Sequence, residues 1–324
     1  MRSESLGDLP DLWKATYDLV AQVPEGMVTT YGEVAKALGD IVASRFVGLA
    51  MSKNDDIDRV PCRRVVQTDG YVGGYTGGGP AKKIRLLKEE GIQILHEKVV
   101  NLEQIIFKDF ETTLPLRELR RRQTSLKRHL KLGELKGRLA RVAGIDVAYE
   151  GEHAHAAMVT FDYESGEEVD RIVIEGDAKF PYVPTYLAFR EIPIIRPLMK
   201  HLDASTVLMY DGNGILHPEG FGITSQIGVV FNVPTVGVAK KLLCGTVSAP
   251  SSGRARKIVH GDQNIGYAIV GNANRNPVYV SAGHLVTSEQ ARDIALRFLK
   301  HRVPEPTRVA HIAAEDARLR TNHK

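Results

Sequence analysis

The spacing of apolar and turn residues changes once along the chain. This change indicates two domains with different folds. Up to Gly91, short apolar stretches are separated by turn residues. From Glu97 to Pro115 a mixed apolar and charged stretch carries no assignable motif, and long β-like runs follow it. A chain of 324 residues also exceeds the usual size of one hydrophobic core. We therefore predict a small domain over residues 1–96, a junction over 97–115 and a larger domain over 116–324.

The small domain has the apolar spacing of short helices. The pattern predicts a first helix within residues 11–23. Thr30 can cap a second helix that begins near Tyr31, with Glu33 at the third position of a capping box. A third helix is predicted over residues 43–51. Two short helices joined this tightly are typical of a helix-turn-helix that binds DNA, although ordinary helix packing produces the same pattern.

The larger domain has apolar runs of strand type. They cover residues 141–149, 154–163, 169–175, 205–210 and 234–239. Residues 184–202 have the pattern of a helix. Strands first, then strands alternating with helices, indicate a mixed sheet with helices packed on it. The predicted class is α/β overall, with a small, mainly helical domain ahead of the mixed-sheet domain.

Composition excludes several classes of protein. Hydrophobic residues make up 43% of the chain, yet no run of about twenty apolar residues occurs. The first five residues lack the apolar core of a secretion signal. The two cysteines, Cys62 and Cys244, lie far apart, which excludes a metal cluster of thiolates and argues against a disulfide framework. We expect a soluble, cytoplasmic protein that does not contact membranes.

Basic residues crowd one segment, although the net charge is only +4. They are Arg117, Arg120, Arg121, Arg122, Lys127, Arg128, Lys131, Lys136, Arg138 and Arg141. Such a run supplies phosphate contacts to a nucleic acid, and it equally fits a solvated helix face. The sequence leaves both interpretations open.

Cys62 is the first candidate for chemistry. It lies in Arg59-Val60-Pro61-Cys62-Arg63-Arg64-Val65-Val66, ahead of a glycine-rich turn at residues 73–79. A thiol reacts as the thiolate, which nearby positive charge stabilises, and the flanking arginines fit this need. A lone cysteine is more often a small buried hydrophobe, so these residues alone leave both interpretations open.

Further strings surround Cys62, in order from Leu12 to Ile92. They are Tyr31-Gly32-Glu33-Val34-Ala35, Ser44-Arg45-Phe46-Val47-Gly48, Asn54, Gly74-Tyr75-Thr76-Gly77-Gly78, Lys83, Leu86-Leu87 and Glu90-Gly91. Together they resemble the C-terminal domain of O6-alkylguanine-DNA alkyltransferases. In that family a cysteine in Pro-Cys-His-Arg takes the alkyl group from guanine irreversibly, after the nucleotide is flipped out of a bent duplex.

The resemblance implies a role for each matched residue. Cys62 would be the alkyl acceptor, Arg45 would fill the vacated stack, and Tyr31 would donate a proton near the flipped base. The other matches would build the pocket and the proton relay: Tyr75 and Thr76 as pocket lining, Asn54 as the residue that orders the turn beside the cysteine, and Glu90 as the end of the relay.

Arg63 departs from the family pattern, because it stands where the family has the relay histidine. A guanidinium cannot act as a base at accessible pH. It can still stabilise a thiolate electrostatically, so transfer could proceed by a different activation. The alternative is a module that recognises the lesion without transfer, as in alkyltransferase-like proteins. Those typically carry tryptophan at the cysteine position, and the cysteine kept here favours transfer.

Three carboxylates form the second candidate site. Asp146 lies inside the apolar run 142–149, where an unpaired carboxylate would be costly to bury. Asp211 ends another apolar run, and Glu191 lies in the helical pattern between them. Hard oxygen ligands of this kind suit magnesium-dependent phosphodiester hydrolysis. The simpler interpretations are a turn at residues 211–214 and a surface position for Glu191.

Longer strings surround these carboxylates, from about Leu116 to Ala317. They are Gly144-Ile145-Asp146-Val147-Ala148, Pro181-Tyr182-Val183-Pro184, Leu187-Ala188-Phe189-Arg190-Glu191, Asp211-Gly212-Asn213-Gly214 with His217-Pro218, Gly237-Val238-Ala239-Lys240-Lys241, Ser281-Ala282-Gly283-His284 and Pro304-Glu305-Pro306-Thr307-Arg308. They resemble endonuclease V. The resemblance implies an RNase H-like fold that nicks DNA or RNA on the 3′ side of inosine, with Mg²⁺ or, as a substitute, Mn²⁺.

This second resemblance also implies residue roles. Asp146, Glu191 and Asp211 would be the metal ligands, and His284 the fourth member of the site. Lys240 would contact the scissile phosphate or the attacking water. Two residues would meet the lesion: Tyr182 as the wedge that replaces it in the stack, and His217 in the base pocket, unless His217 is structural.

Two positions depart from the endonuclease V pattern. Thr185 stands where glycine is common, and Gln226 stands where a histidine is often found. The whole chain is thus predicted to be a bifunctional DNA-repair enzyme that acts on double-stranded DNA containing alkylguanine or deoxyinosine. A lesion-binding adaptor ahead of the nuclease is the alternative, as is a nuclease that prefers inosine in RNA.

Overall fold

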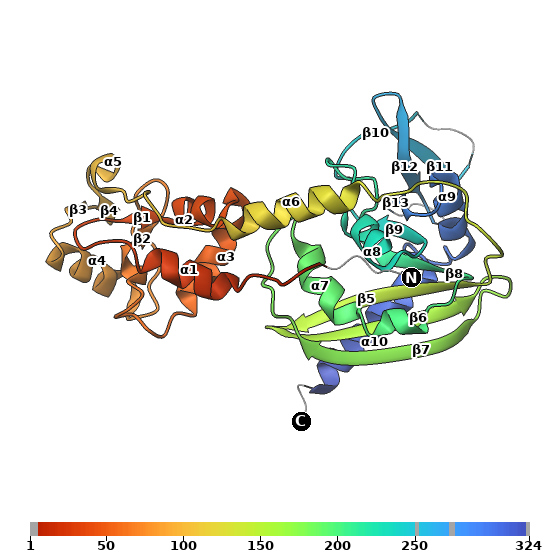
Figure 1. Ribbon diagram of the computed structural model, residues 1–324, viewed down its shortest axis with the longest axis horizontal. Coiled ribbons are helices and arrows are strands. Elements are labelled where there is room, and N and C mark those ends of the chain that lie inside the picture. Colours follow the sequence, from red (N-terminus) through yellow and green to blue (C-terminus); the bar gives the residue numbers. More distant parts are fainter. Residues whose placement is uncertain (1–5, 250–252, 272–275, 322–324) are drawn as a thin grey trace. The chain divides into compact units, whose positions relative to one another are not determined.

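The computed structural model describes residues 6–249, 253–271 and 276–321, and the chain divides into two compact units. The larger unit comprises Met1–Gly7, Gln123–Lys179 and Ala188–Lys324. The smaller unit comprises Asp8–Arg122 together with Phe180–Leu187. Segment 180–187 thus lies in the smaller unit, although it is flanked in sequence by parts of the larger one. Figure 1 shows the elements of both units.

The smaller unit is mainly helical. Its helices are α1 (Leu12–Val20), α2 (Tyr31–Leu38), α3 (Ser44–Ser52), α4 (Gly79–Glu89) and α5 (Leu102–Ile105), with a 3₁₀ turn η2 (Cys62–Arg64). The short strands β1 (Thr29–Thr30) and β2 (Val65–Val66) pair in parallel, and β3 (Ile94–Leu95) pairs with β4 (Lys98–Val99). These elements confirm the predicted helical class.

Local capping explains where α2 begins and ends. The Thr30 hydroxyl accepts a hydrogen bond from the Glu33 amide at 3.1 Å, as the sequence predicted. Gly39, in the left-handed conformation at φ 106°, ends the helix. A 3₁₀ turn, η1 (Ile41–Ala43), leads directly into α3, which buries Phe46 and leaves Arg45 exposed. The pair α2–α3 has the arrangement of a helix-turn-helix.

Residues 97–115 are ordered and pack within the smaller unit. The Val28 amide donates to the Ile105 carbonyl at 3.0 Å, and the Phe107 amide donates to the Val28 carbonyl at 2.6 Å. Val99 joins the apolar cluster of this unit, with Leu102 packed against it. The stretch without a sequence motif therefore completes the fold of the smaller unit.

The larger unit is built on a nine-stranded mixed sheet. Its spatial order is β10-β11-β12-β13-β9-β8-β5-β6-β7. In chain order the strands are β5 (Arg141–Glu150), β6 (His153–Asp162), β7 (Glu168–Asp177), β8 (Thr206–Asp211), β9 (Thr235–Ala239), β10 (Thr246–Val247), β11 (Ala255–His260), β12 (Gln263–Ile269) and β13 (Val278–His284). Strand β5 pairs in parallel with β8 and antiparallel with β6. The mixed α/β class is confirmed.

Helices cover this sheet. They are α7 (Leu187–Ile195), the 3₁₀ turn η3 (Leu198–His201), α8 (Ile223–Phe231), α9 (Ser288–Arg297) and α10 (Glu305–Thr321). Helix α10 packs on β5 and β6 (Figure 1). A Cβ atom at Gly144 of β5 would lie 2.0 Å from the Pro306 carbonyl oxygen of α10. Glycine is therefore required at residue 144 for α10 to approach the strand this closely.

The basic segment begins on α6 (Pro115–Lys127). Leu116, Leu119 and Leu126 are buried, whereas Arg117 and Arg121 are exposed. The helix is thus amphipathic, with a solvated arginine face. No helix in the described part of the chain is long and apolar enough to span a membrane.

Candidate active sites

Parallel pairing brings Asp146 and Asp211 together. Strands β5 and β8 are in register from Arg141 opposite Thr206 to Ile145 opposite Tyr210. The next residue on each strand is an aspartate, so the two carboxylates are neighbours, and each raises the electrostatic cost of charging the other. Burial, followed by the charge on Asp211, raises the pKa of Asp146. Lys240, just after β9, places its Nζ 2.7 Å from Asp211 Oδ2.

Glu191 of α7 is the most deeply buried carboxylate of this group. Burial raises its pKa to about 7, and the charges of Asp146 and Asp211 act in the same direction. The Tyr210 hydroxyl donates a hydrogen bond to Glu191 Oε2, which opposes that rise. The adjacent Arg190 forms an ion pair with Glu152 at 2.9 Å. Negative charge is therefore concentrated where the three carboxylates meet.

His311 of α10 also belongs to this cluster, although it was not predicted from the sequence. Its Nδ1 lies 2.8 Å from Asp146 Oδ2, and half of its side chain is exposed. The close packing of α10 at Gly144 carries His311 to this position. His311 follows the matched string 304–308 by three residues, which is one helical turn, so the helical continuation of that string was the available signal.

Cys62 begins η2 in the smaller unit and is buried. The Asn54 side-chain amide donates to the Val60 carbonyl at 2.9 Å, which ties down the chain just before the cysteine. Burial raises the pKa of Tyr31 and of Tyr75, and in each case the second cause is Cys62. Both phenols therefore lie within electrostatic reach of the thiol.

The other residues predicted for this site lie on neighbouring elements. Arg45 is exposed on α3, and Thr76 is exposed on the glycine-rich turn. The Thr76 hydroxyl donates a long hydrogen bond, 3.5 Å, to the Met51 carbonyl.

Glu90 binds both arginines that follow the cysteine. Arg63 Nε lies 2.5 Å from Glu90 Oε1, and Arg64 Nε lies 2.7 Å from Glu90 Oε2. Arg64 also donates to the Val23 carbonyl at 2.7 Å. The guanidinium of Arg63 thus takes the carboxylate that a relay histidine would use.

Lys83 of α4 is a buried cation beside this thiol. Its Nζ donates to the Val65 carbonyl at 2.6 Å and to the Gly74 carbonyl at 3.3 Å. Burial lowers the pKa of Lys83 to about 8, and attraction to Cys62 opposes the shift. Lys83 is one of the residues that resemble the alkyltransferase family, but the resemblance gave it no role.

Comparisons with known proteins match the two parts of the chain that carry these sites. The sequence model of endonuclease V matches residues 124–312. That of the DNA-binding domain of 6-O-methylguanine DNA methyltransferase matches residues 11–92. A bifunctional methyltransferase/endonuclease of Picrophilus torridus is 34% identical over 93% of this chain and 95% of its own length. The chain belongs to the bifunctional methyltransferase/endonuclease family. Its C-terminal part is an endonuclease V domain, and members of that family depend on metal ions.

Two further proteins are similar to all or part of this chain. A bifunctional methyltransferase-like/endonuclease of Nanoarchaeum equitans is 33% identical over 89% of the chain and 82% of its own length. The endonuclease V of Ciona intestinalis was solved in complex with a 24mer DNA containing an inosine followed by a ribo-adenosine. It is 26% identical, with a TM-score of 0.58, over 64% of this chain and 98% of its own.

The position of His284 corrects the prediction for the endonuclease domain. His284 pairs with Thr235 of β9, whereas Asp211 pairs with Val238, three residues farther along the same strand. Thr235 and Val238 are roughly 10 Å apart along β9, so His284 and Asp211 lie at different heights on the sheet. His284 Nδ1 accepts a hydrogen bond from the Lys131 amide at 3.2 Å, and burial lowers its pKa to about 4. His284 anchors the chain near Lys131, and His311 is the histidine beside the carboxylates.

The donor set of the endonuclease domain fits a divalent cation. Asp146, Glu191 and Asp211 offer hard oxygen ligands, and burial raises the pKa of Asp146 and of Glu191, which disfavours their charged forms without a compensating cation. Lys240 and His311 supply one ammonium and one imidazole against three carboxylates. The excess negative charge is what a metal ion would balance.

The two residues predicted to meet inosine lie on loops, and the two departures from the endonuclease V pattern lie on a loop and on α8. Tyr182 is 61% exposed on the segment 180–187. Thr185 of the same segment has φ +69°, a backbone conformation that explains why glycine is common at this position. His217 Nδ1 accepts a hydrogen bond from the Glu219 amide at 3.2 Å. Gln226 is buried on α8 and accepts a hydrogen bond from the side chain of Gln123 at 3.3 Å.

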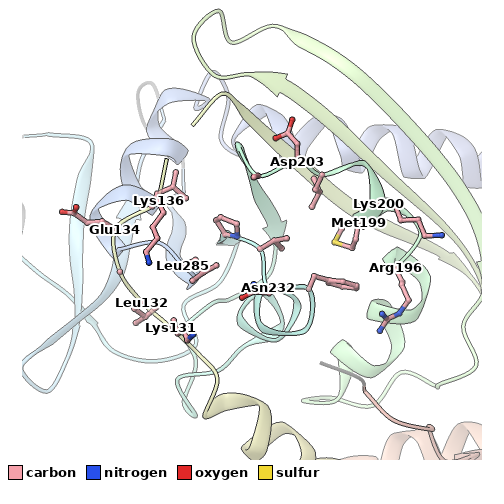
Figure 2. A pocket seen from close by; sticks show the side chains of 17 residues that line it. Lys131, Leu132, Glu134, Lys136, Arg196, Met199, Lys200, Asp203, Asn232 and Leu285 are labelled. Carbon is pink, nitrogen blue, oxygen red and sulfur yellow. The ribbon is translucent and has the colours of Figure 1, made fainter. Parts of the chain in front are cut away.

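A cavity of about 700 Å³ lies elsewhere in the endonuclease domain (Figure 2). Asp203, before β8, and Pro234, before β9, line it, together with Leu285 and residues 131–136. These are the amino ends of the strands, whereas Asp211 marks the carboxyl end of β8. The cavity is therefore separate from the carboxylate site.

Proposed function

We propose that the endonuclease domain hydrolyses the phosphodiester bond 3′ to deoxyinosine in double-stranded DNA. The observation that carries this proposal is the convergence of Asp146, Glu191, Asp211, Lys240 and His311 on one region of the sheet. The inosine-containing DNA bound by the Ciona relative supports the choice of lesion.

Mg²⁺, with Mn²⁺ as a substitute, would be held by Asp146, Glu191 and Asp211. When bound, such an ion activates water and stabilises charge on the leaving oxygen. Lys240 lies beside Asp211 with 47% of its side chain exposed, so its ammonium is available to a phosphate oxygen. His311 has Nδ1 engaged by Asp146, which leaves Nε2 as the atom that accepts or delivers a proton.

Tyr182 and His217 would recognise the lesion. An exposed aromatic ring between two prolines has little conformational freedom to lose when it enters the base stack, and Tyr182 meets this condition. His217, on the loop after Asp211, would line the pocket for the displaced base.

Cleavage of matched substrates tests this half of the proposal. An oligonucleotide duplex with one deoxyinosine is incubated with the full chain and Mg²⁺, beside an identical duplex with deoxyadenosine. A nick on the 3′ side of inosine alone is expected. The same inosine placed in an RNA strand at equal salt tests the RNA alternative, because phosphate affinity depends steeply on ionic strength. Faster cleavage of RNA than of DNA would overturn the assignment of DNA as the substrate.

For the N-terminal domain, we propose irreversible transfer of an alkyl group from O6-alkylguanine to Cys62. A bond forms between Sγ and the alkyl carbon, the bond between that carbon and O6 breaks, and guanine leaves with one proton. Tyr31, beside the thiol, would deliver that proton to guanine and take up the proton that the thiol loses. Arg45, exposed on the second helix of the helix-turn-helix, would fill the vacated stack.

Activation of the thiol would differ from the family's relay. Glu90 is occupied by Arg63 and Arg64, so the route through a histidine is closed. The buried Lys83 ammonium lies within electrostatic reach of Cys62. We infer that the Lys83 ammonium balances the negative charge that develops on Sγ during attack.

The intact mass of the full chain, after incubation with an O6-methylguanine duplex, tests the transfer. A gain of one methylene in the wild type and in Cys244→Ala, but not in Cys62→Ala, is expected. Arg63→His restores a base next to the thiol and is expected to accelerate transfer about tenfold. Binding of the duplex without any gain in mass would favour the alternative, a lesion-recognition module, which agrees with the methyltransferase-like name of the Nanoarchaeum relative.

A further inference from the structure

A second group of metal-ligating side chains lies on the outer strands of the endonuclease domain. His153 and His155 of β6 stand opposite Asp177 and Glu175 of β7, respectively. Residues two apart on a strand share a face, so all four side chains project from the same side of the sheet. No step of the proposed nuclease or alkyl-transfer reaction uses them.

Three of these residues can reach one ion. One ligand atom from each of His153, His155 and Glu175 lies within 4.8 Å of the others. His153 Nε2 is 3.8 Å from Glu175 Oε2. Ligand atoms on one tetrahedral zinc ion lie roughly 3.4 Å apart, as bond lengths near 2.1 Å require. Small side-chain adjustments would therefore close the site.

Asp177 orients one of the imidazoles. Its Oδ1 lies 2.9 Å from His153 Nδ1, on the opposite edge of the ring from the nitrogen that faces Glu175. A carboxylate behind a histidine in this way fixes the tautomer whose free nitrogen binds a metal. Three side chains thus offer ligand atoms, and Asp177 orients one of them.

His155 gives evidence for a bound ligand that is independent of the distances. Its side chain is 2% exposed, and Nε2 has no hydrogen-bond partner within the described part of the chain. A buried polar atom without a partner costs about 1–3 kcal/mol, and such atoms are rare in native proteins. A metal ion held with His153 and Glu175 would satisfy it.

The site has room for a further ligand. His155 and Glu175 line a cavity of about 440 Å³, with Arg171, Asp316 and Arg320 around it. Along the sheet, His155 pairs with Ala148 of β5, two residues beyond Asp146. The cavity lies toward the edge strand β7, outside the cluster of Asp146, Glu191 and Asp211.

We propose that His153, His155 and Glu175 bind one divalent transition-metal ion of the zinc class. Two imidazoles and one carboxylate suit Zn²⁺, Co²⁺ or Ni²⁺, whereas Mg²⁺ prefers oxygen ligands alone. Three protein ligands leave the fourth position open toward the cavity. The bound ion links β6 to the edge strand β7, so it also stabilises the domain by mass action.

Cobalt binding tests the site, with the full chain prepared without a histidine tag. The starting protein carries Asp146→Asn and Asp211→Asn, so that the carboxylate cluster no longer competes for the ion. Titration with Co²⁺, followed by its visible absorption, is expected to show one tight equivalent. His153→Ala and Glu175→Gln, both at side chains open to solvent, should each weaken binding at least tenfold, and Asp177→Asn about tenfold.

Matched controls decide the outcome. His155→Ala should remove the equivalent, and His260→Ala, at an exposed histidine on β11, should leave it intact. If His155→Ala does not fold, the His153 and Glu175 variants carry the test alone. Unchanged Co²⁺ binding in those variants, or no tight equivalent in the starting protein, would overturn the proposal and leave these residues as an ordinary ion-pair network.

Discussion

The two candidate sites have opposite charge imbalances. The carboxylate cluster joins Asp146, Glu191 and Asp211 against Lys240 and His311. Around Cys62, one carboxylate, Glu90, faces Arg63 and Arg64, with the Lys83 ammonium buried nearby. Excess negative charge suits a site that binds a metal cation, and excess positive charge suits a site that forms a thiolate.

The sites also differ in how the chain builds them. Residues 31–90 hold every predicted member of the cysteine site, on consecutive short elements. The carboxylate cluster draws on β5, α7, β8, the end of β9 and α10, which span residues 146–311. Because the first site is local and the second depends on strand register and helix packing, substitutions should separate their activities cleanly.

Removal of one aspartate of the carboxylate cluster gives the largest expected separation. Asp146→Asn or Asp211→Asn should lower cleavage at deoxyinosine by on the order of 10³-fold or more, because the cation loses a charged ligand. Alkylation of Cys62, measured as intact mass, should stay within twofold of the wild type. Loss of both activities in either variant would mean that the two sites are not independent.

A substitution of Lys83 should change how the free energy of unfolding depends on pH. This effect belongs to the cysteine site and not to the carboxylate cluster. Its pKa is lowered from 10.5 to about 8 in the folded chain, so the unfolded state binds more protons between these values. Stability conferred by this position must therefore rise as pH increases from about 8 to 10.5. Relative to Lys83→Met, the wild type should gain roughly 3 kcal/mol across that window.

Urea denaturation at several pH values measures this difference. The single tryptophan, Trp13, lies on α1, so its fluorescence reports on the smaller unit. Lys82→Met, at the exposed neighbouring position, is the matched control and should run parallel to the wild type. Parallel curves for Lys83→Met and the wild type would contradict the assignment of a buried ammonium.

A smaller effect should distinguish the two histidines of the endonuclease domain. His311→Ala removes the imidazole beside Asp146 and should lower cleavage about 10- to 100-fold, as expected for a group that transfers a proton. His284→Ala removes an acceptor for the Lys131 amide and should lower stability while changing the cleavage rate less than threefold. Single-turnover assays at saturating enzyme measure both rates, and equal losses would contradict the separation.

The wrong prediction for His284 shows what local sequence patterns cannot predict. Alternation and apolar runs predicted β5, β6 and β7 to within two residues at each end, because these are local properties. Whether a residue at the end of β13 reaches Asp211 depends on the pairing of β13 with β9, which no local pattern encodes. His284 ends a matched string and His311 lies three residues beyond another, and only three-dimensional packing shows which of them reaches the carboxylates.

The region after β7 shows a second limit. Residues 184–202 have one continuous helical pattern, yet α7 ends at Ile195 and η3 begins after Pro197. Pro197 lacks a backbone donor and lies between the two elements, although α7 contains Pro193 within its length. The segment 180–187 packs in the smaller unit through contacts distant in sequence: the Tyr186 hydroxyl donates to Asp40 Oδ2 at 2.8 Å. Periodicity gave no sign of this contact.

Thr185, within that segment, carries the smallest predicted effect. A β-branched residue at φ +69° is strained, so Thr185→Gly should relieve strain and stabilise the smaller unit. Glycine also makes the unfolded chain more flexible, and the long hydrogen bond from Arg120 to the Thr185 hydroxyl, 3.4 Å, is lost. The net gain should be about 1 kcal/mol or less, read from Trp13 fluorescence in urea. Asn101→Gly is the control, because asparagine tolerates its φ of +55° and should gain less. If Thr185→Gly is less stable than the wild type, the hydroxyl contact outweighs the backbone strain. Threonine at this position would then hold segment 180–187, which carries Tyr182, in the smaller unit.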